Sequence, residues 1–297
     1  MGESPSTPSP PMNNPIEISV IVPVYNAAST LAQSLEALRR ESALEPACEL
    51  IFVDNGSTDG SADMVRTFPG ITLLHEPRRG AYAARNRGVL AARGGLLAFT
   101  DPDCIVAAGW LRAAKEALRD NGCLVALGAR RPAPDEGLNR LLGDYEVTKD
   151  RWVLSGNEPV KYYGFTNTMA TCRVAWERYG PFDDRLRGSD TIFVRRLVNG
   201  EGCGAVRFVD GMRVAHLEID GPSSYLRKTF IYGRSLESYR RTITASPLTL
   251  RDRVRVFRAT AREHAYGLPQ ASALAFLLVA GVAAWSAGRF AGRLRRR

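Results

Sequence analysis

Two carboxylates stand on either side of a proline where an apolar segment ends. Asp101 and Asp103 flank Pro102, directly after the apolar residues 96–100. Carboxylate oxygens are ligands that Mg²⁺ and Mn²⁺ prefer, and these ions keep coordination positions open for phosphate oxygens. A divalent ion held by such a pair could stabilise a leaving diphosphate. Asp-Pro-Asp is also a common turn, so this interpretation needs support from the rest of the chain.

The elements around this motif alternate between strand and helix. Apolar, β-branched segments predict strands at 18–24, 50–53, 72–75, 96–100 and 124–127. Helical spacing and composition predict helices at 31–40, 61–68, 81–92 and 107–119, although Gly88 weakens the third. This order predicts an α/β domain with a doubly wound, mostly parallel sheet, whose first half is Rossmann-like and binds a nucleotide. Ligands of such sheets bind at the carboxyl ends of the strands, where the polar turns of this chain fall.

The middle of the chain, 129–188, has little periodicity. It combines proline, glycine and aromatic residues, which is typical of loops that bind a second substrate on a rigid scaffold. Regular elements are predicted again at 189–198, as a helix, and at 206–209 and 212–216, as two short strands. His216 therefore lies at the end of a predicted strand.

Four polar motifs follow the predicted strands in a fixed order. They are Val24-Tyr25-Asn26, the segment 54–60 (DNGSTDG), the segment 80–88 (GAYAARNRG), and Phe99-Thr100-Asp101-Pro102-Asp103. Their order and spacing closely resemble those of the family-2 glycosyltransferases, which are inverting enzymes with the GT-A fold. The resemblance extends over about residues 16–216, and it implies a GT-A glycosyltransferase domain in this part of the chain.

The resemblance also implies roles for the residues that match the family's motifs. Contacts with a nucleotide-sugar donor are implied for Pro23, Tyr25, Asp54, Gly80, Arg85 and Asp101, with Tyr25 near the donor base and Asp54 hydrogen-bonded to it. Asp103 would be the ligand of a divalent metal cofactor, Mn²⁺ or Mg²⁺, and His216 would lie near the metal or the diphosphate. The residues alone leave other roles open: Tyr25 could be a strand-end aromatic, Asp54 a turn former, Arg85 part of a solvated helix face and His216 a structural residue.

Inverting transfer also needs a general base that removes the proton of the acceptor hydroxyl. In the family this carboxylate belongs to a Glu-Asp pair before a helix, and the matching pair here is Ser189-Asp190. The resemblance therefore makes Asp190 the catalytic base, while the serine leaves the role of the missing acid open. Asp190 could also cap the helix by accepting backbone hydrogen bonds. The Gln-x-x-Arg-Trp motif of processive relatives is absent from the sequence, which favours a single transfer per encounter.

The net charge of +9 is concentrated in the last quarter of the chain. Residues 221–297 carry 15 Lys and Arg against three acidic residues, so the rest of the chain is slightly acidic. This distribution indicates contact with a membrane surface or another anionic partner, and it argues against a nucleic-acid partner. The basic segment 221–264 is predicted to be helical. Within it, residues 225–241 mix aromatic residues with Lys and Arg, which suits lipid headgroups or a lipid-linked acceptor. An ordinary solvated helix is the alternative.

An uncharged run, 265–288, follows the basic segment. As a helix it would reach about 36 Å, enough to cross a bilayer core, but basic residues on both sides conflict with a single span. We therefore expect a helical hairpin that re-enters the membrane or lies on it, with breaks at Pro269 and Gly281, before the basic end of the chain. A buried C-terminal helix is the alternative.

The cellular location follows from the remaining composition. Five widely spaced cysteines suggest neither a disulfide framework nor a zinc site, and residues 1–15 are typical of a flexible tail and not of a signal peptide. The expected location is the cytoplasmic face of the cell membrane.

Two other functions fit parts of the sequence. A catalytically silent module that binds a nucleotide sugar or a glycan would explain Ser189, whereas the intact Asp103 and Asp190 argue against it. A nucleotidyltransferase would need a basic, Gly-rich loop after the first strand, and residues 25–28 (YNAA) lack it. We therefore expect transfer of a sugar from a nucleoside diphosphate sugar to a glycan or lipid-linked acceptor. The sequence does not specify the base, the sugar or the acceptor.

Overall fold

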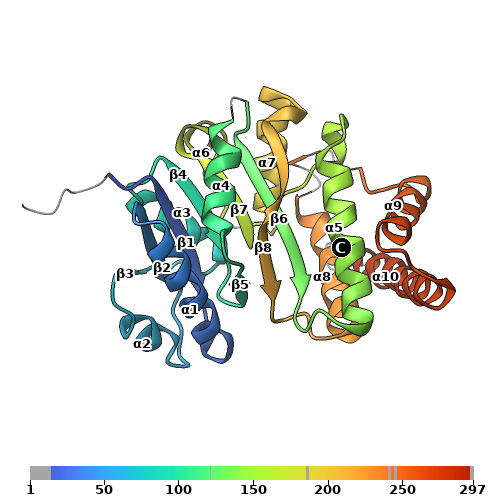
Figure 1. Ribbon diagram of the computed structural model, residues 1–297, viewed down its shortest axis with the longest axis horizontal. Coiled ribbons are helices and arrows are strands. Elements are labelled where there is room, and N and C mark those ends of the chain that lie inside the picture. Colours follow the sequence, from blue (N-terminus) through green and yellow to red (C-terminus); the bar gives the residue numbers. More distant parts are fainter. Residues whose placement is uncertain (1–14, 121, 185–186, 240–241, 244–245, 295–297) are drawn as a thin grey trace, which may run out of the picture.

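The computed structural model describes residues 15–294 except 121, 185, 186, 240, 241, 244 and 245. Its centre is an eight-stranded sheet in the order β3-β2-β1-β4-β7-β6-β8-β5, with helices on both faces (Figure 1). The strands are β1 Ile18–Val24, β2 Cys48–Asp54, β3 Ile71–His75, β4 Leu96–Thr100, β5 Cys104–Val106, β6 Val125–Pro132, β7 Thr168–Cys172 and β8 Val206–His216. The helices are α1 Ala28–Leu44, α2 Ser61–Arg66, α3 Ala81–Ala91, α4 Trp110–Arg119, α5 Gly137–Leu154, α6 Arg173–Tyr179, α7 Ser189–Glu201, α8 Pro222–Tyr239, α9 Leu250–Glu263 and α10 Leu268–Leu294.

The first half of the sheet is parallel, as the sequence predicts. β2 pairs with β1 and β3, and β1 pairs with β4, all in parallel register. Every residue of β1 is buried, which explains why its sequence is a continuous apolar run. Pro23 lies beyond Ile21, the last residue of β1 that pairs with β4, so its missing N–H removes no hydrogen bond from that pair.

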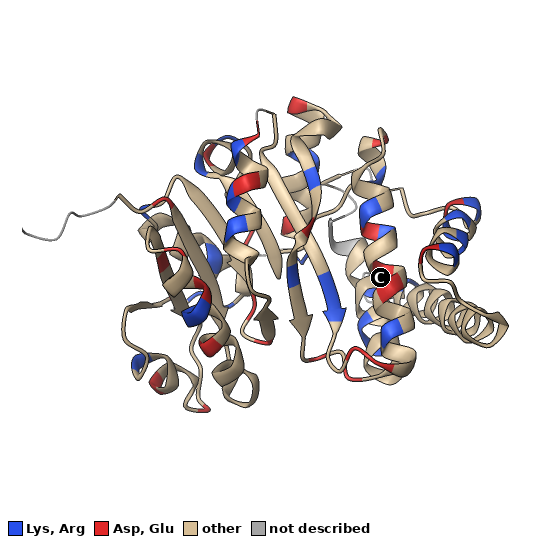
Figure 2. Ribbon diagram, in the orientation of Figure 1, with Lys and Arg blue, Asp and Glu red and all other residues tan. Residues whose placement is uncertain are grey.

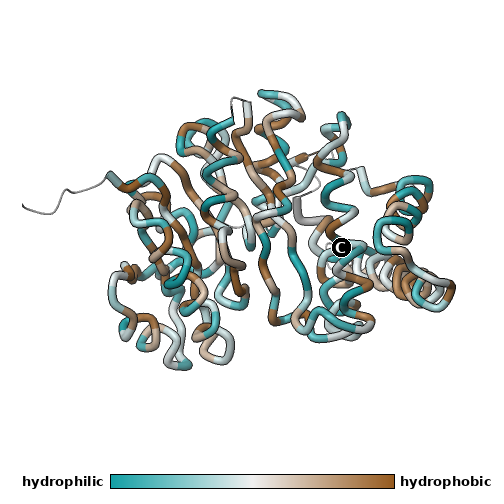
Figure 3. The backbone as a smooth tube through the Cα atoms, viewed as in Figure 1, coloured by the Kyte–Doolittle hydropathy of each residue, from teal (hydrophilic) through white to brown (hydrophobic). Residues whose placement is uncertain are grey.

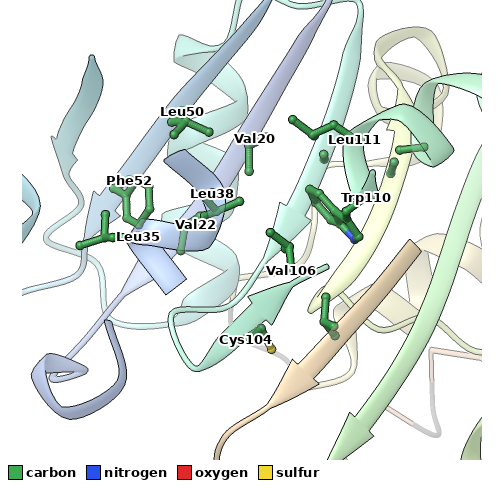
Figure 4. Packing of buried hydrophobic residues seen from close by; sticks show 14 of the residues in the cluster. Val20, Val22, Leu35, Leu38, Leu50, Phe52, Cys104, Val106, Trp110 and Leu111 are labelled. Carbon is green, nitrogen blue, oxygen red and sulfur yellow. The ribbon is translucent and has the colours of Figure 1, made fainter. Parts of the chain in front are cut away.

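Alternate residues of β1 pack toward opposite faces of the sheet. Val20 and Val22 belong to a core cluster with residues of α1 and α4, including Leu35 and Trp110 (Figure 4). Ile21 points to the other face, against α3. A Cβ on Gly88 would lie 2.5 Å from Ile21 Cγ2, so only a glycine lets α3 approach the sheet this closely. The residue that weakens the helical pattern is therefore required by packing.

The second half of the sheet is mixed. β7 is antiparallel to β4 and β6, β8 is parallel to β6, and β5 is antiparallel to β8. The two strands expected at 206–209 and 212–216 are one strand, β8, with a register shift opposite Gly128 and Ala129. The sequence gives no indication of β5, because three residues are too few for a periodic pattern.

The segment 129–188 is largely regular, so the expectation of loops is wrong. It includes the 18-residue helix α5, followed by β7 and α6. The buried side of α5 carries acidic residues: the side chains of Asp144 and Asp150 are 2 % and 1 % exposed, and they pair with Arg131 and Arg130 of β6. Ion pairs thus take positions where apolar residues would reveal the helical period.

The C-terminal run forms one uninterrupted helix, α10, so the expected hairpin is wrong. Pro269 is the second residue of α10, where a missing N–H breaks no helical hydrogen bond. Gly281 causes no break either. A Cβ on Gly281 would lie 3.2 Å from the Tyr225 ring, and one on Gly288 would lie 2.0 Å from the Phe230 carbonyl oxygen. The residue numbers of the contacts increase together along the two helices, so α8 and α10 run parallel in close backbone contact.

α10 keeps one apolar face exposed. Among the described residues it is the helix that is long and apolar enough to cross a membrane, and 22 % of its most apolar 18-residue window is buried. α10 carries little charge, whereas α9 is strongly basic (Figures 2 and 3). The exposed apolar side chains of α10 include Leu268, Phe276, Val279, Val282, Phe290 and Leu294. Apart from Pro15, the tail expected at 1–15 lies outside the described residues, as do the last three arginines.

Candidate active site

Asp103 and His216 come together at the end of the β5·β8 pair. Cys104, the first residue of β5, faces His216, the last residue of β8, in antiparallel register. The Leu217 N–H donates to the Asp103 carbonyl oxygen at 2.9 Å and extends this pairing by one step. The Asp103 carboxylate consequently lies 3.5 Å from His216 Nδ1.

These two side chains fit a divalent ion. His216 Nδ1 is buried and has no hydrogen-bond partner among the described residues, so one tautomer of the ring presents an unused lone pair toward Asp103. Asp103, Cys104 and His216 each offer one possible ligand atom, and these three atoms lie within 4.8 Å of one another. Burial raises the pKa of the Cys104 thiol, and a neutral thiol is a poor ligand for Mg²⁺ or Mn²⁺. Asp103 and His216 are therefore the candidate ligands.

The electrostatics of this pair also favour a cation. Burial, together with the charges of Asp101 and Glu218, raises the pKa of Asp103 to about 7. Burial and the neighbouring ammonium of Lys228 lower the pKa of His216 to about 4. The carboxylate form of Asp103 lacks a strong positive partner here, while the imidazole stays neutral. A bound cation would stabilise both groups in the state that a metal ligand requires.

Lys228, from α8, lies against the other nitrogen of the same ring. Its Nζ is 3.3 Å from His216 Nε2 and 2.7 Å from Glu218 Oε2. The Lys228 side chain is mostly buried, with 16 % exposed. In the sequence α8 is recognisable only as a basic helix, because the spacing of its residues does not show which turn lies beside the end of β8.

Asp54, for which the family resemblance implies a contact with the donor base, is the last residue of β2. Parallel register aligns Val24, Asp54 and His75 across three strands, so their chain ends share one edge. Burial raises the pKa of Asp54, but hydrogen bonds from Ser57 and Gly56 outweigh it, and the net pKa is lowered. An ionised acceptor therefore faces a cavity of about 380 Å³. The cavity is lined by Asp54, Arg66, Leu73, Leu74 and His75.

Tyr25 and Gly80 lie at the same edge. Tyr25 is half exposed just after β1, and the Arg79 guanidinium lies 4.2 Å from its ring centroid. Gly80 has a φ of +133°, and its N–H donates to Asn55 Oδ1 at 2.7 Å, which ties the start of α3 to the loop after β2. Pro23, in contrast, is buried within β1.

Arg85 reaches the Asp101-Pro102-Asp103 turn from α3. Its side chain is 5 % exposed and forms an ion pair with Asp101, so it does not belong to a solvated helix face. Its guanidinium carbon lies 5.3 Å from the ring centroid of Tyr82, one turn earlier on the same helix. The Arg85 Nε is buried and has no hydrogen-bond partner among the described residues. Arg85 thus fixes the carboxylate next to the candidate metal ligand.

Asp190 is the second residue of α7. The N-cap of this helix is Gly188, with φ +85°, and not Asp190. The Asp190 carboxylate accepts a hydrogen bond from the Thr191 N–H at 2.8 Å, and its interaction with the Tyr82 hydroxyl lowers its pKa. Burial raises the pKa of Asp190 despite these interactions. The Ser189 hydroxyl is buried and unpartnered within the described chain, so an acid at this position would be buried as well.

The structure therefore joins the expected residues into connected groups. One group is the Asp103–His216 pair, and the other runs from Asp101 through Arg85 and Tyr82 to Asp190. The turn at 101–103 links them. Sequence reasoning missed Tyr82, Arg79, Lys228 and Glu218, which act on predicted residues through contacts that depend on the tertiary fold.

The mixed sheet carries carboxylates and a histidine at one edge, an arrangement that fits the GT-A class of glycosyltransferases. This chain belongs to glycosyl transferase family 2, whose pattern matches residues 19–178, more than half of the sequence. Glycosyltransferase AglE of Haloferax volcanii is 37% identical over 99 residues, covering 32% of this chain and 33% of AglE. The uncharacterized glycosyltransferase YibD of Escherichia coli is 38% identical over 96 residues, covering 31% and 27%. The matches thus span a third or less of these relatives.

Solved structures share the fold over a longer stretch. The mannosyltransferase PcManGT from Pyrobaculum calidifontis, in complex with GDP-Man and Mn²⁺, has a TM-score of 0.64 at 20% identity, covering 99% of this chain and 92% of that one. Glucosyl-3-phosphoglycerate synthase from Mycobacterium tuberculosis, in complex with phosphoglyceric acid, has a TM-score of 0.53 at 19% identity, covering 75% and 79%. At these identities the likeness establishes the GT-A fold.

Proposed function

We propose that this protein transfers a sugar from a nucleoside diphosphate sugar to a hydroxyl of a glycan or lipid-linked acceptor, with inversion at the anomeric carbon. The observation that carries the proposal is the placement of the Asp103–His216 pair beside the group from Asp101 to Asp190. Membership of glycosyl transferase family 2 supports the reaction class. The complex of a structurally similar mannosyltransferase with GDP-Man and Mn²⁺ supports the donor class and a divalent metal.

Each part of the site has one chemical task in this reaction. A divalent ion held by Asp103 and His216 would supply positive charge to the leaving diphosphate. Asp190 would accept the proton of the acceptor hydroxyl while that oxygen attacks the anomeric carbon. Its raised pKa makes the ionised carboxylate a stronger base than an exposed aspartate. Asp54 would accept a hydrogen bond from the donor base in the adjacent cavity.

We also propose that the protein lies on the cytoplasmic face of the cell membrane. The second half of α10 packs against α8, and Leu274 of α10 packs in a cluster with Leu141 and Tyr145 of α5. Because these contacts hold α10 against the domain, α10 would lie along the membrane surface with its apolar face toward the lipid. Exposed arginines on α9 would contact anionic headgroups: Arg251, Arg255, Arg258 and Arg262. This position suits a lipid-linked acceptor, and the absence of the Gln-x-x-Arg-Trp motif favours a single transfer per encounter.

The test is a donor panel of UDP, GDP and dTDP sugars with Mn²⁺, read out as nucleoside diphosphate release and as the anomeric configuration of the product. Release with one donor class, abolished by Asp190→Asn, is the expected result. No turnover with any donor and acceptor would leave a binding module instead. Release of pyrophosphate would point to nucleotidyl transfer.

A further inference from the structure

The ring of His216 lies between an acidic side chain, Asp103, and a basic side chain, Lys228, which come from different parts of the fold. Nδ1 faces Asp103 at 3.5 Å, and Nε2 faces the Lys228 ammonium at 3.3 Å. Lys228 belongs to α8, outside the matched family region, and also pairs with Glu218. The tasks proposed for Asp103 and Asp190 do not explain why a largely buried ammonium lies at the candidate metal site.

The hydrogen bond between Lys228 and His216 is incompatible with metal binding by the same ring. An ammonium can only donate, so Nε2 must accept and the proton of the neutral ring must sit on Nδ1. A metal on Nδ1 requires the opposite tautomer, with the proton on Nε2, and a metal on Nε2 would occupy the position of the ammonium. Either mode of coordination therefore releases Lys228 from His216.

We propose that Lys228 is a diphosphate-binding residue that His216 holds until the metal and donor enter, an inference that rests on the proposed sugar transfer. Once released, the ammonium would stay anchored by Glu218 at the candidate metal site, where it would supply positive charge to a bound diphosphate. In the transfer step the bond between the anomeric carbon and the diphosphate oxygen breaks. Its electron pair stays on the diphosphate, where the Lys228 charge stabilises it, while the acceptor proton goes to Asp190.

This role predicts two opposite changes in binding when the ammonium is removed. In Lys228→Met, His216 loses a competing cation, so Mn²⁺ alone should bind several-fold more tightly. The nucleoside diphosphate should bind about tenfold more weakly at saturating Mn²⁺, because a charge-assisted contact is lost. The matching nucleoside monophosphate should be affected less. A purely structural lysine would instead weaken metal and nucleotide binding together.

The experiment is calorimetric titration of the full chain with Mn²⁺, then with the best-bound of UDP, GDP and dTDP and with its monophosphate. Arg227→Met removes the same charge from the neighbouring, exposed position of α8 and serves as the matched control. Lys228→Arg keeps the charge and should retain most diphosphate affinity, which keeps the test valid if the methionine variant folds poorly; an arginine variant with the same loss as methionine would contradict the charge role.

Two failures can be told apart. If the wild-type protein binds a nucleoside diphosphate but Lys228→Met binds it equally well, the role of Lys228 is wrong and the proposed transfer stands. If the wild-type protein binds none of the three diphosphates with Mn²⁺, the proposed function fails, and the role of Lys228 fails with it.

Discussion

The Asp103 carboxylate lies 3.5 Å from His216 Nδ1 because Cys104 faces His216 across the β5·β8 pair. Residues 113 positions apart in the sequence are thus brought together by backbone pairing, and the distance between the two candidate ligands does not depend on a flexible loop. Backbone pairing therefore holds the two side chains close together before any metal or donor arrives.

Replacement of Asp103 tests the metal site directly. Asp103→Asn keeps the shape of the side chain but removes its charge, so Mn²⁺ binding should weaken strongly and sugar transfer should fall by about 10² or more. Mn²⁺ titration and nucleoside diphosphate release measure the two effects. Asp120→Asn changes an exposed carboxyl that pairs with Arg207 and should leave both unchanged. Full Mn²⁺ affinity in Asp103→Asn would exclude this residue as a ligand.

Replacement of Asp190 tests the base. Asp190→Asn should lower the transfer rate by about 10²–10⁴ while donor binding persists, because only proton removal is lost. The base acts when ionised, so wild-type activity should rise with pH through the Asp190 pKa, which burial raises above the usual aspartate value. A pH–rate profile of both proteins is the measurement. An acid limb that survives in the asparagine variant would belong to another group.

The hydroxyl of Tyr82 should tune this pH dependence. Its interaction with Asp190 favours the ionised form and so lowers the pKa of that carboxyl. In Tyr82→Phe the acid limb should therefore move to higher pH, with a smaller change in the rate at the plateau. Tyr179→Phe removes a hydroxyl that bonds Glu201 on the surface and is the control. An unshifted limb in Tyr82→Phe would contradict the predicted coupling.

The buried ion pair of Arg85 should contribute to stability. Arg85→Met leaves Asp101 without its partner and next to Asp103, so the free energy of unfolding should drop by about 3 kcal/mol. Added Mn²⁺ should restore part of this loss, since a cation replaces the missing charge and binds only the folded state. Chemical denaturation with and without Mn²⁺ measures both. In Arg119→Met an exposed pair with Glu17 is lost, at a cost below about 1 kcal/mol.

The exposed face of α10 should carry membrane binding. Phe276→Glu and Val279→Glu introduce charges on side chains that are 73 % and 70 % exposed, so they should reduce binding to anionic vesicles about tenfold or more without lowering the melting temperature. Co-sedimentation measures the binding. Leu90→Glu, on α3 and 73 % exposed, is the matched control. Equal binding by all three variants would assign the membrane contact to another surface or to none.

The sequence by itself determined the parallel half of the sheet and the choice of most candidate site residues. β1, β2 and β4 are buried on both faces, so their residues are almost all apolar and stand out without an alignment. Asp54 and Asp101 follow such strands, and the order of the motifs indicated a glycosyltransferase. These features are local, and local patterns are what a single sequence displays.

Only the tertiary structure decided the second half of the domain and the surroundings of each functional side chain. α5 escaped prediction because Asp144 and Asp150 are neutralised by arginines on another strand, and Gly281 reads as a break although it is a contact point with Tyr225. Lys228 reaches His216 only because the tertiary fold places this turn of α8 beside the end of β8. Side chains from distant parts of the sequence form ion pairs and hydrogen bonds in the folded protein, and their spacing along the chain does not predict these pairs.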